Sequence, residues 1–231
     1  MAAAARRRIT VPGLRGAERT VPAATVARLP LYLRALVVLE DSGTGLVSSE
    51  ELAAASGVTS TKLRKDLSYL GSYGRRGVGY DVSALRRHIE DAMGLTRDLP
   101  VLIVGVGNLG HALANYSGMT GRGFTVVGLI DADDALVGQE VAGTVVRPLG
   151  ELESLLGQNP GCIGVVAVPA SAAQAVTDRL VAAGVRSILT FAPLSLDVPE
   201  GVEVRKVDLA VELQILAYHE RLRTGSAVAA G

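Results

Sequence analysis

Three glycines, at positions 105, 107 and 110, have the spacing in this sequence that most directly indicates a binding chemistry. They form the pattern G-x-G-x-x-G immediately after the apolar run 101–104, and the Ala- and Leu-rich residues that follow favour a helix. In such a strand, turn and helix, the first glycine permits the turn, the second lets backbone N–H groups approach phosphates, and the third allows close helix packing. The pattern predicts a dinucleotide pyrophosphate site made by Gly105, Val106, Gly107, Asn108, Leu109 and Gly110.

Asp131 supplies the second part of this pattern. It follows the apolar run 124–130 and lies 21 residues after Gly110. A carboxylate at this place accepts hydrogen bonds from the ribose hydroxyls of an adenosine and repels a 2′-phosphate. Three glycines in an α/β turn could serve tight packing alone, but the acid that accompanies them favours a dinucleotide.

The segments around this motif alternate between strand-like and helix-like patterns, which predicts a doubly wound parallel sheet with helices on both faces. Ligands of such sheets bind beyond the carboxyl ends of the strands. We therefore expect Val168, Pro169, Phe191 and Ala192 near the nucleotide, although Pro169 and the loop at 191–193 could equally serve only to end their strands. The expected strands are 101–104, 124–130, 143–147, 163–168, 187–190 and 202–207, and the expected helices between them include 150–156 and 171–183.

A helix, a glycine-containing turn and a second helix are predicted over residues 48–70. Ser48 and Glu51 form the capping box that starts the first helix,. Gly57 lies in the turn. The second helix gathers its apolar side chains on one face, at Leu63, Leu67 and Leu70. This arrangement is typical of a helix-turn-helix.

The opposite face of the second helix carries the prediction of DNA binding. Residues 59–76 hold five cations and one acid, Asp66, which lies nearer the core side. The glycines and tyrosines of 71–80 favour a short β-hairpin, and Ser83 is the expected cap of a closing helix that ends at Met93. A recognition helix followed by a basic hairpin indicates a winged helix, in which the helix enters a major groove and the hairpin reaches the backbone or minor groove; the alternative is a solvated basic patch. The predicted DNA contacts are Thr61, Lys62, Arg64, Lys65, Ser68, Tyr73, Arg75, Arg76 and Gly77.

Length and charge distribution indicate two unequal domains. The chain has 231 residues, of which 48% are hydrophobic. Residues 1–95 contain 14 Lys and Arg against 9 Asp and Glu, and residues 96–231 contain 9 against 14, so the zero net charge divides into +5 and −5. This asymmetry suggests an anionic partner for the first half. The predicted organisation is a flexible basic arm over 1–20, a winged-helix domain over 21–95, a linker over 94–100, a Rossmann domain over 96–207, a helix over 208–223 and a frayed tail over 224–231.

Other classes of site are excluded or not favoured by composition. Cys162 is the only cysteine, which excludes a disulfide scaffold and a cysteine-based zinc site. We interpret it as a small buried hydrophobe rather than a reactive thiol. No apolar run has the length of a membrane span, and the arginines at 6–8 follow rather than precede the N-terminal alanines, unlike a signal peptide. We expect a cytoplasmic protein without a metal site.

The last predicted helix, from Leu209 to Leu222, is apolar over most of its circumference. One flank of a monomer would bury only part of such a surface. We therefore expect the helix to dock into a second subunit.

The histidines argue against an enzyme. His88, His111 and His219 are scattered over three elements, and none has an evident catalytic partner. A DNA-binding module gated by a dinucleotide accounts for both halves of the chain, because the binding free energies of two ligands are reciprocally coupled. Two alternatives stay open at this point: an NAD-dependent oxidoreductase with a helical appendage, and a regulator that responds to CoA or another nucleotide.

Several segments in both halves resemble the Rex family of redox-sensing repressors. They are 25–34 (TVARLPLYLR), 63–69 (LRKDLSY), 76–80 (RGVGY), 191–193 (FAP) and 208–213 (DLAVEL), and the likeness extends over about 21–222 in family order. The resemblance implies a homodimer with winged helices, Rossmann domains and exchanged C-terminal helices. It also implies sensing of NADH against NAD⁺, with the reduced form releasing the operator DNA of respiratory and fermentative genes, and binding rather than hydride transfer.

The resemblance also implies roles for individual residues. Gly105 to Gly110 and Asp131 would hold NAD(H), Tyr116 would lie near the nicotinamide, and Arg64, Lys65 and Arg76 would contact DNA. Arg34 and Asp208 match residues that couple the two domains, although on sequence alone Asp208 is equally a helix N-cap and Arg34 a solvated charge. Thr61 and Lys62 stand where family members often have a large apolar residue or Gln, which leaves the operator preference open at those positions.

Overall fold

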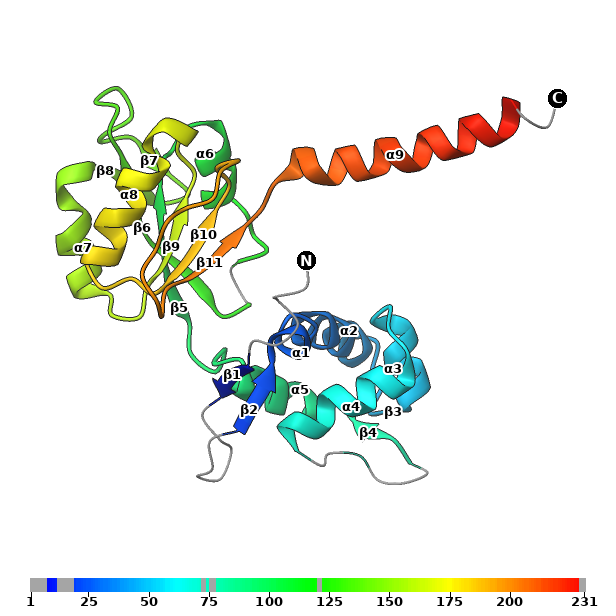
Figure 1. Cartoon of the computed structure of the whole chain (residues 1–231). Coiled ribbons are helices and arrows are strands. Elements are labelled where there is room, and N and C mark those ends of the chain that lie inside the picture. The colour runs from blue at the N-terminus through cyan, green and yellow to red at the C-terminus, as the bar shows by residue number, and fades with distance from the viewer. Residues whose placement is uncertain (1–7, 12–18, 72–73, 75–77, 120–121, 229–231) are drawn as a thin grey trace. The chain divides into compact units, whose positions relative to one another are not determined.

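The chain divides into two compact units, Met1–Arg97 and Asp98–Gly231, each with its own core. The structure, a computed structural model, describes residues 8–11, 19–71, 74, 78–119 and 122–228 (Figure 1). The first unit is mostly helical and the second is an α/β layer structure, which confirms the predicted fold class.

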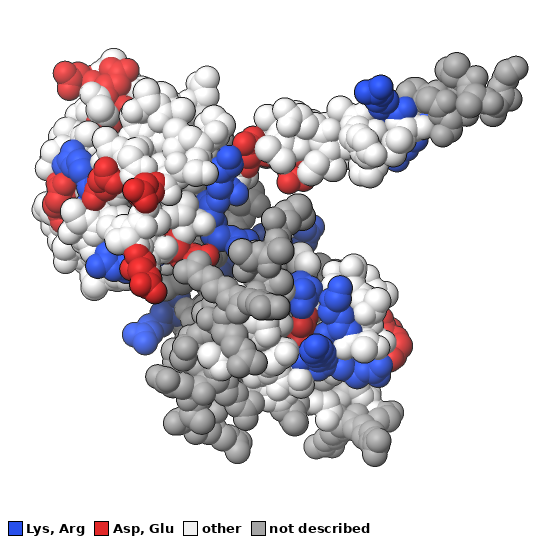
Figure 2. Space-filling model, viewed as in Figure 1, with Lys and Arg blue, Asp and Glu red and all other residues white. Residues whose placement is uncertain are grey.

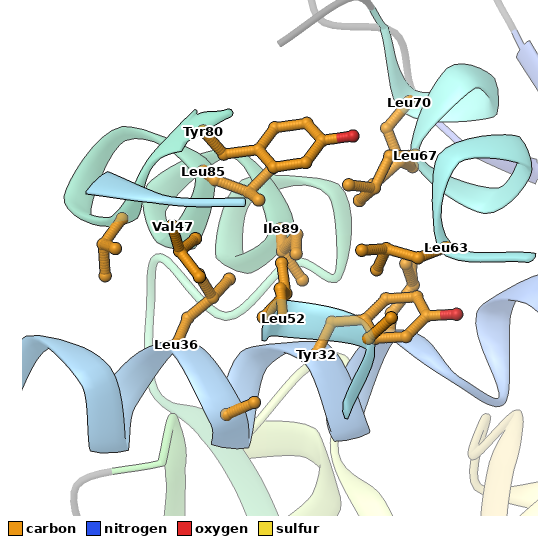
Figure 3. Close-up of a cluster of buried hydrophobic side chains, with 14 of the residues drawn as sticks. Tyr32, Leu36, Val47, Leu52, Leu63, Leu67, Leu70, Tyr80, Leu85 and Ile89 are labelled. Atoms are coloured by element: carbon orange, nitrogen blue, oxygen red, sulfur yellow. The ribbon is translucent and has the colours of Figure 1, made fainter. Parts of the chain in front are cut away.

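Five helices make up most of the described part of the first unit. They are α1 (Ala23–Val26), α2 (Leu29–Asp41), α3 (Ser49–Ala55), α4 (Ser60–Leu70) and α5 (Val82–Ala92). The capping box of α3 is formed as predicted: the Glu51 N–H donates to Ser48 Oγ at 3.1 Å, and the Ser48 N–H donates to Glu51 Oε2 at 2.8 Å. The apolar face of α4 packs against α2 and α5, and Figure 3 shows these side chains meeting in one cluster that includes Tyr32, Leu36, Leu52, Leu63, Leu67 and Ile89.

The second strand of the predicted hairpin pairs with a strand that the sequence patterns did not identify. β4 (Tyr80–Asp81) runs antiparallel to β3 (Leu46–Val47). Gly79 permits this approach, since it has φ +101° and a Cβ there would lie 2.3 Å from the carbonyl oxygen of Val47. The hairpin residues Tyr73, Arg75, Arg76 and Gly77 lie outside the described residues.

The predicted cap of α5 is wrong. Asp81 rather than Ser83 caps this helix, because Asp81 Oδ1 accepts from the Ala84 N–H at 2.8 Å. The hydroxyl of Ser83 donates to the same carboxylate oxygen at 3.0 Å. Both residue types favour N-caps, and the aspartate is the one that precedes the first helical turn.

The predicted flexible arm over 1–20 is wrong where the structure describes it. β1 (Arg8–Val11) and β2 (Arg19–Pro22) pair antiparallel, with Arg8 opposite Pro22 and Val11 opposite Arg19. The sequences RITV and RTVP are rich in β-branched residues, which favour strands, and Val21 is fully buried in the core of the first unit. The remaining residues of the expected arm lie outside the described ranges.

The second unit is built on a seven-stranded sheet in the order β11-β10-β9-β5-β6-β8-β7, parallel except for β7. Such an order, which starts at a central strand and continues outward on both sides, is the doubly wound arrangement. The strands are β5 (Leu99–Val104), β6 (Phe124–Asp131), β7 (Glu140–Val141), β8 (Thr144–Pro148), β9 (Ile163–Val166), β10 (Ser187–Thr190) and β11 (Glu203–Lys206). The helices are α6 (Asn108–Ala114), α7 (Leu152–Gln158), α8 (Ala170–Ala182) and α9 (Leu209–Val228), with a 3₁₀ turn at Leu149–Glu151.

The two faces of this sheet bury separate cores. Leu102, Val104 and Val166 pack on one face with residues of α7 and α8, and Val101, Ile103 and Val165 pack on the other, where Leu113 of α6 contacts them. This alternation follows from the two-residue period of a strand. Both faces of β5 are covered, as predicted for a central parallel strand.

The boundaries of several elements differ from the predictions. Leu99 and Pro100 belong to β5 rather than to a linker, because the Leu99 N–H donates to Gly123 while Pro100 needs no N–H partner. β9 ends at Val166, two residues before the predicted end at Val168, and Pro169 is the N-cap of the next helix, α8. The short antiparallel strand β7 was not predicted.

Helix α9 extends to Val228, so the predicted frayed tail is wrong over 224–228; residues 229–231 lie outside the described chain. No proline interrupts this segment, and the helix continues through it. Every side chain from Leu209 to Arg223 is exposed, including the large apolar ones. Among the described residues, no helix combines the length and apolar character that crossing a membrane requires.

Candidate functional site

The glycine loop between β5 and α6 requires glycine at its two ends because a Cβ atom there would collide with the protein's own backbone. Gly105 has φ +95°, and a Cβ on it would lie 2.6 Å from the carbonyl oxygen of Ala167. A Cβ on Gly110 would lie 1.8 Å from the carbonyl oxygen of Gly105. These contacts are with backbone, which cannot move aside as a side chain can. The first and third glycines therefore allow the loop to close against α6 and the end of β9.

At the middle glycine, Gly107, neither the backbone conformation nor the surrounding protein atoms require glycine. A Cβ on Gly107 would meet no protein atom within 4 Å, and its φ of −62° is open to any residue. Gly107 is exposed and occupies the N-cap position of α6 without a side-chain cap. The chain thus leaves open space in front of the loop N–H groups, which is the space that a phosphate needs. Asn108 and Leu109 follow it and are also exposed, whereas the side chain of Val106 is buried.

Asp131 lies beside this loop, as predicted. Its Oδ2 accepts from the Val106 N–H at 2.6 Å and its Oδ1 accepts from the Asp133 N–H at 2.9 Å. Parallel pairing of β6 with β5 brings the two together, with Ile130 opposite Val104. A carboxylate has about four acceptor sites, so both oxygens keep capacity for the hydroxyls of a ribose. Sequence reasoning missed Asp133, whose N–H helps fix the carboxylate plane.

The ends of β9 and β10 lie at the same edge of the sheet as the glycine loop. The Ala167 N–H donates to Val104 at 2.8 Å, and the Phe191 N–H donates to Val166 at 3.2 Å. A Cβ on Gly105 would lie 2.8 Å from Val168 Cγ1, which places Val168 against the loop. Phe191 is half-buried.

The other residues predicted to contact the cofactor differ in their exposure to solvent. Pro169 is exposed at the start of α8. Ala192 is 2% exposed and packs in the sheet core, and its contact with the nucleotide stays a prediction. Tyr116, just after α6, is 54% exposed. Among the described residues, no group of three His, Cys, Asp or Glu side chains is placed to hold a metal ion.

The face of α4 that the sequence predicts to contact DNA is exposed along its length. Thr59 caps the helix, with its hydroxyl accepting from the Lys62 N–H at 3.3 Å. Arg64 Nη1 lies 3.6 Å from Glu50 Oε1 of α3 in an exposed ion pair. Such a pair adds little stability, so the guanidinium can bind another anion in place of Glu50. Figure 2 shows Lys and Arg side chains gathered over this part of the first unit. The exposed residues are Thr61, Lys62, Arg64, Lys65 and Ser68.

The inner side of α4 carries an ionic cluster that sequence reasoning missed. Asp66, 2% exposed, accepts hydrogen bonds from Arg28 Nε at 2.6 Å, Arg28 Nη2 at 2.7 Å, Tyr32 Oη at 2.6 Å and Thr25 Oγ1 at 2.9 Å. Burial alone would raise the pKa of Asp66, but the hydrogen bonds from Arg28, Tyr32 and Thr25 together outweigh it and lower that pKa. Burial, and then the hydrogen bond to Asp66, raise the pKa of Tyr32 to about 12.

The two predicted coupling residues lie in different units. Arg34 is exposed on α2. Asp208 caps α9, with its Oδ1 accepting from the N–H groups of Ala210 and Val211 at 3.2 and 3.4 Å, and its Oδ2 lies 3.4 Å from Lys206 Nζ. The capping role is thus present, and the coupling role stays a prediction.

A helix-turn-helix unit followed by a Rossmann unit with an open glycine loop defines a DNA-binding regulator of nucleotide-responsive type. Two family models match the chain: one described as "Putative DNA-binding protein N-terminus" over residues 20–68, and one described as "CoA binding domain" over residues 96–194. The redox-sensing transcriptional repressor Rex of Streptomyces avermitilis is 63% identical over 213 residues, which are 92% of this chain and 84% of that protein. The Rex protein of Desulfitobacterium hafniense is 44% identical over 86% of this chain and 95% of its own. The chain belongs to the Rex family of redox-sensing transcriptional repressors.

Solved structures show the same likeness. RSP, a Rex-family repressor, in complex with NAD⁺ and operator DNA, matches with a TM-score of 0.81 and 34% identity over 88% of this chain and 95% of that one. Its complex with NADH matches with a TM-score of 0.78 and 33% identity over 87% and 94%. These matches confirm the family that the sequence segments indicated.

Proposed function

We propose that this protein represses transcription by binding operator DNA and releases that DNA when NADH replaces NAD⁺ in its second unit. The observation that carries the proposal is the open space at Gly107 beside the carboxylate of Asp131, on a chain whose exposed helix α4 carries Lys62, Arg64 and Lys65. Relatives named as redox-sensing repressors, and a family structure with NAD⁺ and operator DNA, support it.

We further propose that the active species is a homodimer. The apolar side chains of α9, among them Leu213, Leu216 and Tyr218, are exposed in a single chain. Burying one such side chain stabilises by about 1.5–3 kcal/mol, so a helix that exposes several of them favours association. A dimer also suits a palindromic operator, because its two recognition helices then read two half-sites.

The proposed chemistry is binding and not hydride transfer. An equilibrium between a DNA-binding and a DNA-released form shifts only by the difference in affinity that a ligand has for the two. Discrimination between NADH and NAD⁺ is therefore the property that the function needs, and Tyr116, Val168 and Phe191 are the residues that we assign to the nicotinamide side.

A CoA-responsive regulator is the alternative that one observation favours, namely the match of a CoA-binding family model to residues 96–194. CoA carries a phosphate on its ribose, and a carboxylate at Asp131 repels that group while accepting bonds from free ribose hydroxyls. Calorimetric titration of the intact chain with NADH, NAD⁺, NADPH and CoA separates the two. We expect NADH to bind most tightly and NADPH and CoA weakly; tighter binding of CoA would overturn the proposal.

A further inference from the structure

The cluster around Asp66 joins the proposed recognition helix to the start of the chain's first core helix. Asp66 belongs to α4, Arg28 occupies the N-cap position of α2, Tyr32 lies in the first turn of α2, and Thr25 lies in α1. All four hydrogen bonds end on the one carboxylate and span 34 to 41 residues of sequence. Figure 3 shows the ring of Tyr32 beside Leu63. Leu63 and Asp66 are three residues apart on α4, and both are buried.

This cluster is a costly way to hold a helix in place if stability is its only purpose. Taking the Asp66 carboxylate out of water costs several kcal/mol even though 24% of the Arg28 side chain stays exposed, and replacing a buried ion pair by apolar side chains is often neutral or stabilising. Leu63, Leu67 and Leu70 already anchor α4 by burial. Apolar burial turns this face of α4 toward the core but is not directional, so four directional hydrogen bonds fix the rotation of the helix about its own axis more closely.

We propose that Asp66 is a positioning residue for DNA recognition, which sets the rotation of α4 so that the neighbouring Arg64 and Lys65 face the bases. The proposal rests on the proposed function of α4 as the recognition helix. A rotation of about 20° moves atoms about 6 Å from a helix axis by about 2 Å, which is enough to break a hydrogen bond to a base edge.

The direction in which DNA affinity changes when Asp66 is neutralised separates a positioning role from a purely electrostatic one. Asp66 is an anion on the DNA-binding helix, so its neutralisation alone would strengthen binding to any DNA through the phosphates. Loss of positioning would instead weaken binding to the operator, because base contacts specify and phosphate contacts do not. The ratio of the two affinities therefore reports on the rotation of α4.

The test uses the full chain and two duplexes, one selected by the wild-type protein from a random library and one with the same bases shuffled. The variants are Asp66→Asn, the milder Tyr32→Phe, and the double variant Arg28→Met with Asp66→Leu, which replaces the ion pair by apolar side chains. Asp91→Asn is the matched control, since it removes one exposed negative charge from α5 of the same unit. Fluorescence anisotropy gives both DNA affinities, and thermal melting gives stability.

We expect Asp66→Asn and the double variant to lose affinity for the selected duplex by about tenfold or more, the size of one lost base contact, while affinity for the shuffled duplex is unchanged or increases. Tyr32→Phe should show a smaller loss with the same sign, and Asp91→Asn should keep the wild-type ratio. If the double variant melts near the wild-type temperature and keeps the wild-type ratio, the cluster is structural only and the proposal is overturned. A wild-type chain that selects no duplex would overturn the proposed function, and the positioning role with it.

Discussion

Gly107→Ala should abolish most of the cofactor affinity of this protein without destabilising it. A Cβ at this position meets no protein atom within 4 Å, and the backbone there needs no positive φ. Alanine is a weaker N-cap than glycine by about 0.5–1 kcal/mol, but it restricts the unfolded chain by a similar amount, so the free energy of unfolding should change by less than about 1 kcal/mol. The new methyl group would occupy the space in front of the loop N–H groups.

The expected loss of NADH affinity follows from the hydrogen bonds that the methyl group displaces. One hydrogen bond to a charged group contributes about 1.5–3 kcal/mol, so blocking the approach of the pyrophosphate should weaken NADH binding by about 10- to 100-fold. Titration by NADH fluorescence measures the affinity, and thermal melting of the same samples measures the stability.

Two other glycines provide the controls. A Cβ on Gly157, at the end of α7, also meets nothing within 4 Å, so Gly157→Ala should bind NADH like the wild type. Gly110→Ala should instead destabilise the second unit by about 1–3 kcal/mol or more, because its Cβ would overlap the carbonyl oxygen of Gly105,. Wild-type NADH affinity in Gly107→Ala would refute the placement of the pyrophosphate.

Three further results are expected. Lys65→Ala should weaken operator binding and reduce the number of ions released on binding by about one, with NADH affinity unchanged. The control Arg87→Ala, which removes an exposed cation from α5, should change operator binding only slightly. Loss of NADH affinity in Lys65→Ala would show that the lysine is structural. Ser48→Ala should lower the stability of the first unit by about 1 kcal/mol, because it removes the acceptor of the α3 capping box, and an unchanged melting temperature would contradict this. The pKa of Asp66 in the folded protein lies below its ordinary value, so ionised Asp66 stabilises the fold at pH values above that ordinary value, and this contribution is lost as the pH falls through the folded-state pKa. The melting temperatures of the wild type and of Asp66→Asn should therefore converge on acidification. A constant difference between them would contradict the ionised state of Asp66.

The elements that sequence reasoning predicted well are those with local signals. The capping box at Ser48 and Glu51 and the apolar face of α4 depend on spacings of three and four residues, which one helix determines by itself. The glycine loop and Asp131 were predicted together because the order of strand, turn, helix and strand fixes their proximity.

The elements that were missed depend on partners far apart in the sequence. The Arg28–Asp66 pair spans 38 residues, and Asp66 stands among cations on a polar helix, so only its position toward the core side hinted at burial. β3 is two residues long and was identifiable only through its partner β4. Ala192 follows a strand end at the ligand edge of the sheet, and a position along the chain does not reveal that it is buried in the core.

Redox sensing by this protein is tested by titrating the protein–operator complex with NADH and with NAD⁺, while fluorescence anisotropy of the labelled duplex reports DNA release. We expect NADH to release the DNA at a far lower concentration than NAD⁺, and added NAD⁺ to shift the NADH curve to higher concentration by competing for the same site. Equal potency of the two forms would contradict redox sensing, because a ligand that does not distinguish two states cannot shift the equilibrium between them.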